Sequence, residues 1–189
     1  MTSFDQVMRD FSPGDGNEYK LYGKFQGTVV NNVDPLGIAR LMVSVPGVVI
    51  PPSTWAMPCA PVAGFQHGAV SIPPIGSGVW VEFEQGELDH PIWVGCYWGS
   101  VAEMPPSALL GTAATPNIVH QTIGQNAITI FGAPGGGIDI CAGPFLSPTS
   151  PRITLSTAGI ILSDGTGGMI TIMGGTVTIN RTALVVLPG

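Results

Sequence analysis

From residue 128 to its C-terminus, the chain repeats a three-residue pattern in which two apolar residues flank a central one. The seven copies are Ile128-Thr129-Ile130, Ile138-Asp139-Ile140, Ile153-Thr154-Leu155, Ile160-Ile161-Leu162, Ile170-Thr171-Ile172, Val177-Thr178-Ile179 and Leu184-Val185-Val186. Their first residues are separated by 10, 15, 7, 10, 7 and 7 positions, and most of the intervening segments contain Gly, Asn, Asp or Pro. Apolar residues at every second position are typical of strands, and the intervening residue types are typical of turns. The pattern therefore predicts very short strands joined by tight corners.

Such strands present a burial problem. Each places two apolar side chains on one face of the sheet, and no segment after Pro116 has the helical period that could supply a covering layer. Residues 116–189 also carry only four charged side chains, Arg152, Arg181, Asp139 and Asp164. We therefore expect several copies of the chain to turn these faces toward a common axis, with three copies as the simplest arrangement. The prediction for residues 116–189 is a trimeric, intertwined β-helix or β-prism.

Residues 19–99 show a different pattern of longer strands. Five segments are expected to be strands: 21–31, 39–45, 55–60, 78–85 and 91–99. The third contains Pro58, which favours an edge position. Five short strands of this kind are typical of a small OB-type barrel, so the fold class is all-β. Residues 100–115 contain Pro105-Pro106 without a period and are predicted to be a linker.

Composition excludes several classes of protein. Charged residues make up 10% of the chain, against roughly 25% in a typical soluble domain, and no apolar run is long enough for a transmembrane helix. The net charge is −6, which argues against binding to a nucleic-acid backbone. Cys59, Cys96 and Cys141 fit neither a disulfide framework nor a zinc site, so we expect buried free thiols and no metal or cofactor.

The N-terminal residues 1–18 carry an apolar stripe formed by Phe4, Val7, Met8 and Phe11 at helical spacing. A helix this short is not stable alone in water, so the stripe is expected to dock either on its own domain or on a partner. The segment has neither the basic region nor the apolar core of a secretory signal, and we predict that none is present.

Four stretches of the first 99 residues carry a resemblance to a known family. They are residues 22–30 (YGKFQGTVV), 34–40 (DPLGIAR), 73–86 (PPIGSGVWVEFEQG) and 89–99 (DHPIWVGCYWG). They resemble the OB domain of phage baseplate assembly protein V and of the valine-glycine-repeat spikes of type VI secretion and related contractile injection systems. The order of barrel, linker and narrow β segment extends the resemblance over the whole chain.

The resemblance implies a homotrimeric central spike that attaches to a baseplate hub and punctures a target membrane. It implies assembly in the bacterial cytoplasm, then a place in a virion tail or an injection-system baseplate, and the sequence does not separate the two. Residues 1–18 become a candidate hub-docking segment. The apolar end formed by Leu184, Val185, Val186 and Leu187 becomes a candidate contact for a tip protein of the PAAR-repeat kind. Unlike some members of that family, the sequence is expected to carry neither an inserted lysozyme-like domain nor a terminal HxH metal-binding tip.

No residue pattern favours an enzyme. Glu82 and Glu84 could form a pair of catalytic carboxylates, but their alternation with apolar residues is typical of a solvated strand face. His67 is expected to be a loop residue. Two alternatives stay open at this stage: an OB-fold module for oligosaccharide or nucleic acid with a trimerising tail, and a tail enzyme with its site in residues 62–77.

Overall fold

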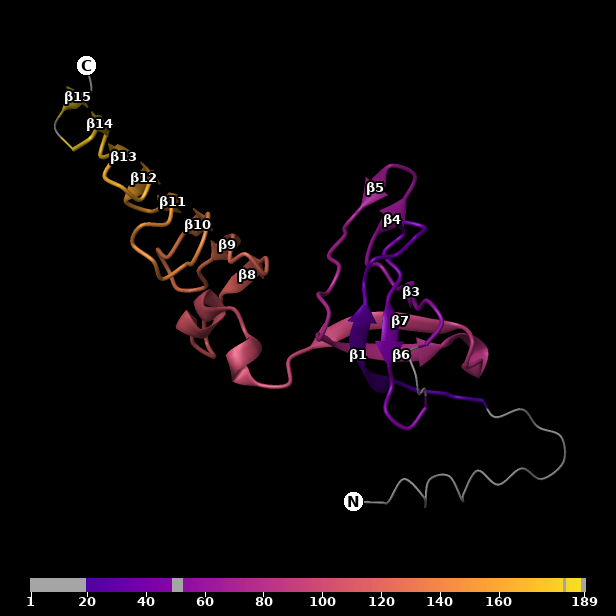
Figure 1. Ribbon diagram of the computed structural model, residues 1–189. Helices are drawn as coiled ribbons and strands as arrows, with labels where there is room; N and C mark the ends of the chain where they lie inside the picture. Colours follow the sequence, from indigo (N-terminus) through magenta and orange to yellow (C-terminus); the bar gives the residue numbers. More distant parts are fainter. Residues whose placement is uncertain (1–19, 49–52, 182, 188–189) are drawn as a thin grey trace, which may run out of the picture. The chain divides into compact units, whose positions relative to one another are not determined.

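The computed structural model describes residues 20–48, 53–181 and 183–187. The chain divides into two compact units, residues 1–99 and 100–189. The first is a small barrel and the second a single antiparallel sheet (Figure 1). The all-β fold class is thereby confirmed. The finer division at 1–18, 19–99, 100–115 and 116–189 stays a prediction, and Phe4, Val7, Met8 and Phe11 lie outside the described residues.

The barrel is built from five strands in the order β2-β1-β6-β7-β3. Their bounds are β1 Phe25–Asn31, β2 Met42–Ser44, β3 Met57–Pro58, β6 Gly78–Phe83 and β7 Pro91–Tyr97. The two-residue strand β3 lies at the end of this order, as its proline predicts, and runs parallel to β7. A bridge between Leu41 and Ala56 joins the β2 side to the β3 side and closes the barrel. This topology is that of an OB fold.

The barrel core is small and aliphatic. Its buried residues are Val29, Leu41, Val43, Val45, Ala56, Val79, Val81 and Phe83. Strand β6 supplies three of them at every second position, as its alternating sequence predicts. The expectation of buried thiols is confirmed for Cys141 and is wrong for Cys59 and Cys96, which are exposed. Both lie where little packs over them, Cys59 directly after the edge strand β3 and Cys96 near the end of β7.

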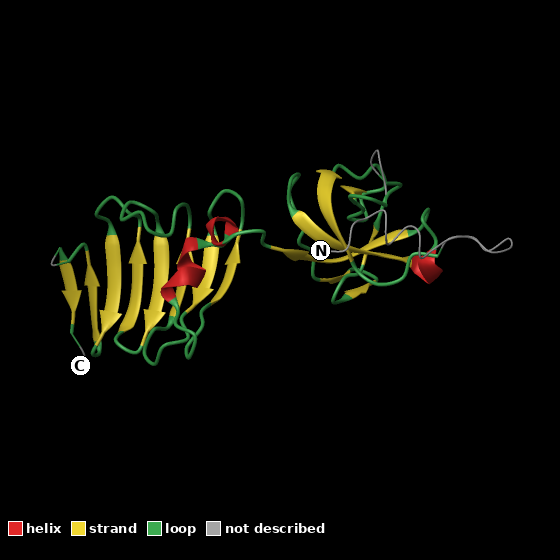
Figure 2. Cartoon of the chain, turned by 90° about the horizontal axis from the view of Figure 1, so that it is seen from below, coloured by secondary structure: helices red, strands yellow, loops and turns green. Residues whose placement is uncertain are grey.

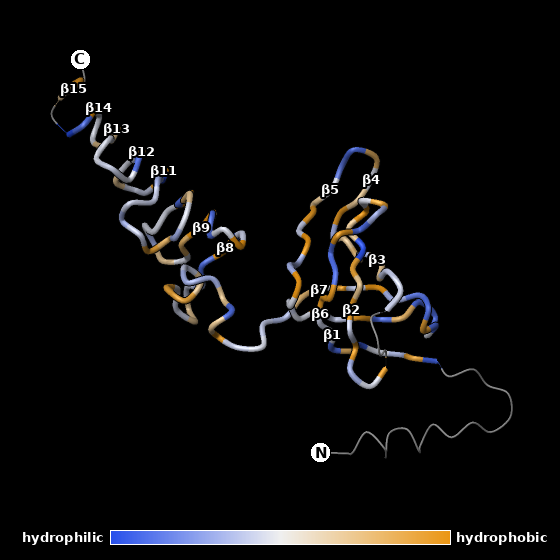
Figure 3. The backbone as a smooth tube through the Cα atoms, in the orientation of Figure 1, coloured by the Kyte–Doolittle hydropathy of each residue, from blue (hydrophilic) through white to orange (hydrophobic). Residues whose placement is uncertain are grey.

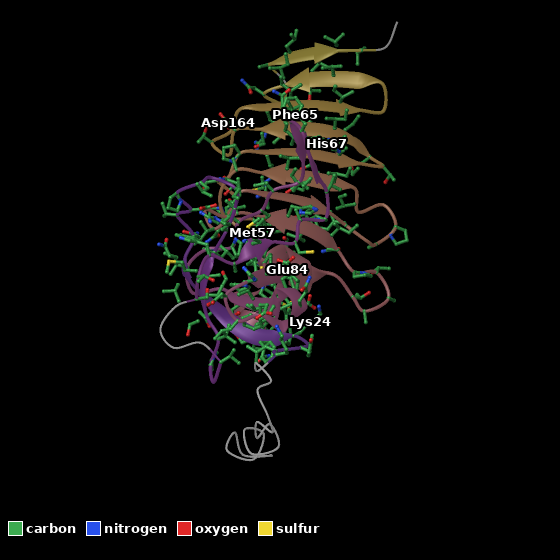
Figure 4. The ribbon with its side chains drawn as sticks, turned by 90° about the vertical axis from the view of Figure 1, so that its right-hand side faces the viewer. Lys24, Met57, Phe65, His67, Glu84 and Asp164 are labelled. Atoms are coloured by element: carbon green, nitrogen blue, oxygen red, sulfur yellow. The ribbon has the colours of Figure 1, made fainter. Side chains whose placement is uncertain are left out.

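Between β3 and β6 in the sequence, the chain forms a two-stranded arm from β4 (Ala63–Gly64) and β5 (His67–Gly68). Figure 4 shows Phe65 and His67 at its far end. Phe65 is 93% exposed and Val70 is 79% exposed. Figure 3 shows the apolar character of the chain on both sides of the arm's tip. The sequence did not predict the arm, because Ala-Gly and His-Gly lack β-branched residues and alternation.

The second unit begins with two short 3₁₀ helices, η2 (Val101–Glu103) and η3 (Pro106–Leu110), and continues as one eight-stranded sheet. Its strands are β8 Ile118–Gln121, β9 Ala127–Ile130, β10 Ile138–Cys141, β11 Arg152–Ser156, β12 Gly159–Ser163, β13 Met169–Met173, β14 Thr176–Ile179 and β15 Leu184–Val186. Each strand pairs antiparallel with its neighbour in sequence, which gives a simple meander (Figure 2). The seven apolar triplets lie in strands β9 to β15.

Candidate functional site

The strand register of the second unit arranges the apolar triplets into two continuous rows on one face of the sheet. Residues directly opposite one another in an antiparallel pair lie on the same face. The first row is Ile118, Ile130, Ile138, Leu155, Ile160, Ile172, Val177 and Val186. The second row is His120, Ile128, Ile140, Ile153, Leu162, Ile170, Ile179 and Leu184. We call these rows the two ladders, and the face that carries them the ladder face.

The ladder face is uncovered in a single chain. Ile118 is 57% exposed, Ile128 46% and Leu184 52%, although branched aliphatic side chains are usually buried. The ladders extend over all eight strands, far beyond the scattered apolar residues of a normal surface. An aliphatic face this continuous requires a covering layer, and the described part of the chain supplies none.

The opposite face of the sheet is polar and is closed at the β8 end of the unit. Thr129 and Asp139 are buried there although they are polar, and Cys141 is buried beside them. Helix η3 packs against β8, and Figure 2 shows the 3₁₀ helices lying across this end of the sheet. At the β8 end the chain therefore covers part of the polar face itself, and it leaves the apolar face free.

A buried carboxylate organises the polar face. Asp139 accepts a hydrogen bond from the hydroxyl of Thr154 at 2.7 Å, and its second oxygen lies 3.7 Å from a guanidinium nitrogen of Arg152. Arg152 also donates to the carbonyl oxygens of Phe145 and Ser147, each at 3.0 Å. These contacts neutralise the buried charge and attach the long loop between β10 and β11 to the sheet.

The described basic residues of the barrel are all engaged with carboxylates. Lys20 pairs with Glu87, and Lys24 pairs with Glu82. Arg40 pairs with Asp34 at 2.6 Å. A groove for nucleic acid uses basic side chains for phosphates, and here acids already occupy them. The barrel geometry therefore gives no support to a nucleic-acid-binding site.

Two family profiles match the chain. The first describes the OB domain of type VI secretion system and phage-baseplate injectors and matches residues 25–98. The second describes the C-terminal trimerisation domain of phage baseplate V proteins and matches residues 117–185. The chain belongs to the baseplate V family of spike proteins. The resemblance seen in the sequence is confirmed, and the trimerisation domain includes every residue of both ladders except Val186. No curated protein matches the chain.

The family assignment fixes the broad role of this baseplate V protein. It is a spike-like component of a phage baseplate or an injection system, and its second unit is a domain for forming trimers. The two matched domains are structural parts of a baseplate. Over the residues that the structure describes, no helix is both long and apolar enough to cross a membrane.

The residues considered for catalysis are not brought together. Glu82 forms an ion pair with Lys24, and Glu84 begins a short 3₁₀ helix. The expectation that His67 is a loop residue is wrong, because it begins strand β5, where it is exposed. Among the described residues, no group of three His, Cys, Asp or Glu side chains of one chain could hold a metal ion.

The four candidate tip residues lie in three different places. Leu184 and Val186 lie in the ladders, opposite Ile179 and Val177. Val185 lies on the other face of β15, and Leu187 follows the strand and is 71% exposed. The sequence could not separate these roles, because all four positions are aliphatic.

Proposed function

We propose that this protein is the membrane-piercing central spike of its apparatus. In this proposal it is a homotrimer whose three ladder faces pack around a common axis, and we call the trimer of the second unit the needle. The single observation that carries the proposal is the pair of ladders on an uncovered face of a trimerisation domain. Burying a branched aliphatic side chain stabilises by about 1.5–3 kcal/mol relative to leaving it in water, and the ladders supply many such side chains per copy.

The same geometry suits a part that must transmit force. Every strand from β8 to β15 is hydrogen-bonded to its sequence neighbour, and most of the connections between them are short turns. Bending such a needle would require many backbone hydrogen bonds to be strained together. Three sheets that cover one another would also leave no long apolar surface in water.

Adjacent isoleucines of β12 give a matched test of the trimer. Ile160 belongs to a ladder, whereas Ile161 lies on the polar face between Thr154 and Thr171. We expect the purified Ile160→Asp protein to be a monomer, as measured by light scattering, because a trimer would bury three carboxylates in an apolar interior. Ile161→Asp should leave the trimer intact. A trimeric Ile160→Asp protein would contradict the proposal.

The membrane-piercing role is tested in the assembled apparatus. We expect particles with wild-type or Ile161→Asp spikes to cause ion leakage from target cells, and particles with Ile160→Asp to cause none. Electron microscopy of the same particles checks that sheath and baseplate have formed. Equal leakage from Ile160→Asp particles would show that piercing does not need this spike.

A tip protein of the PAAR-repeat kind is proposed to cap the β15 end. Two features support it: the exposed Leu187, and the outer edge of β15, along which no described strand pairs. Such open edges are usually covered in native proteins. Binding of a purified PAAR-repeat protein should be lost in Leu187→Asp and kept in Leu36→Asp, a similarly exposed leucine of the barrel. Equal binding by both variants would argue against the cap.

The hub contact is proposed to lie in the N-terminal segment that carries Phe4, Val7, Met8 and Phe11. The spacing of these residues gives one apolar stripe, which suits a groove on a partner. In co-expression with the hub, Phe4→Asp with Phe11→Asp should abolish co-purification, whereas the polar-position control Gln6→Asp should not. If the double variant still co-purifies, the segment is not the hub contact.

A further inference from the structure

One position of the two ladders is not aliphatic. His120 on β8 lies directly opposite Ile128 on β9, on the same face as the rest of the second ladder. It is exposed in the single chain and lies within the trimerisation domain. All fifteen other ladder positions are Ile, Leu or Val. A polar ring at this one place requires a physical reason.

Three-fold symmetry brings the three copies of His120 together. This step rests on the proposed trimer with its ladder faces toward the axis. In such a trimer, symmetry places any residue of the three chains at one level and at one distance from the axis. The three imidazoles therefore face one another across the interior at the β8 end of the needle.

The neighbouring residues of the same ladder indicate how closely the three imidazole rings approach one another. Ile128 follows His120 in the same ladder, and Ile140 follows Ile128. In the proposed trimer these isoleucines fill the interior together with their copies in the other two chains. An imidazole reaches further from the backbone than an isoleucine side chain. Where isoleucines touch, three histidines in the same position bring their ring nitrogens to the axis.

The rings would then need a partner. A buried polar group without a hydrogen bond or ligand is costly, and the adjacent ladder residues Ile118, Ile128 and Ile140 offer no polar atom. Three neutral imidazoles around one point form a nitrogen-only ligand set. This set suits divalent zinc, cobalt, nickel or copper, and does not suit calcium or magnesium, which prefer oxygen.

We propose that the three His120 side chains of the trimer together bind one divalent transition-metal ion on the needle axis. Each chain contributes one nitrogen, and a water completes a tetrahedral set. The ion would join the three chains where the needle begins. No single chain contains the site, which explains why it is not visible as a cluster within one copy.

The test uses the full-length trimer with Cys59→Ser and Cys96→Ser, so that the two exposed thiols do not bind metal. Cobalt(II) is added and followed by its visible absorption, zinc is used as a competitor, and bound metal is counted by elemental analysis after dialysis. We expect one ion per three chains. His120→Ala and His120→Leu should both bind none, and the leucine variant completes the ladder and keeps the trimer. His67→Ala and His90→Ala should bind as the parent does.

Light scattering on every sample separates this proposal from the trimer itself. A parent protein that is trimeric but binds no cobalt or zinc overturns the metal site and leaves the trimer standing. Equal metal content in trimeric His120→Leu also overturns it. A monomeric parent would overturn both.

Discussion

The carboxylate of Asp34 accepts two hydrogen bonds from the Arg40 side chain, from Nη2 at 2.6 Å and from Nε at 3.0 Å. The same carboxylate accepts the backbone N–H groups of Leu36, Ile38 and Arg40. One side chain therefore holds the whole turn that follows β1. The Arg40 guanidinium, aided by these N–H groups, holds the pKa of Asp34 well below its usual range.

Replacing this carboxylate should destabilise the barrel in a pH-dependent way. Because the folded-state pKa of Asp34 is depressed, its contribution is complete above the unfolded value of about 4 and is lost as the pH falls below it. Asp34→Asn should lower the urea midpoint of barrel unfolding at pH 7. The gap, meaning the difference in urea midpoint between wild type and variant, should be smaller at pH 2.5. The control Asp89→Asn should show no such gap. A gap that stays constant with pH would contradict this account.

The buried Asp139 gives a second prediction. Asp139→Asn should destabilise the second unit by roughly 2 kcal/mol, because it removes the negative charge facing Arg152 and weakens the bond from Thr154. Asp164→Asn serves as the control, since the exposed carboxylate of Asp164 bonds only within its own turn. Chemical denaturation of both variants measures the difference. A smaller effect at Asp139 than at Asp164 would show that the polar face does not depend on this carboxylate.

The sequence predicted most of the needle because each triplet repeats a local rule. It missed the first strand, β8, for one reason: His120 stands where the other strands carry an aliphatic residue, so Ile118-Val119-His120 did not match the triplet pattern. The burial of Thr129 and Asp139 was also not predicted, because the alternation within a strand does not say whether its polar face is covered. Local alternation predicts faces, whereas the cover over a face comes from distant parts of the chain.

Two glycines in left-handed conformations should respond differently to alanine. Gly137 has a φ of 77°, and a Cβ there would lie 1.8 Å from the carbonyl oxygen of Leu155. That oxygen belongs to β11, which is paired with β10 and β12 and cannot move away. Gly174 has a φ of 57° but open space around it. Gly174→Ala should therefore lower the free energy of unfolding by about 1 kcal/mol, from backbone strain alone.

Gly137→Ala should lower the free energy of unfolding considerably more than Gly174→Ala does, and it should prevent β10 from pairing normally with β11. Thermal unfolding of the purified trimers, together with the yield of soluble protein, measures both variants. Equal melting temperatures for the two alanine variants would show that the close approach of Leu155 is not a real constraint.

The needle should be kinetically stable. Unfolding one copy would require its ladder face to separate from two others along eight strands before any part gains much freedom, so the barrier should be high even where equilibrium favours the unfolded state. We expect the wild-type protein to run as a trimer in SDS without boiling, and as a monomer after boiling. Ile161→Asp should behave as wild type, and Ile160→Asp should run as a monomer in both samples. A trimer by light scattering that separates at once in cold SDS would mean that the three ladder faces touch without forming a continuous packed interior.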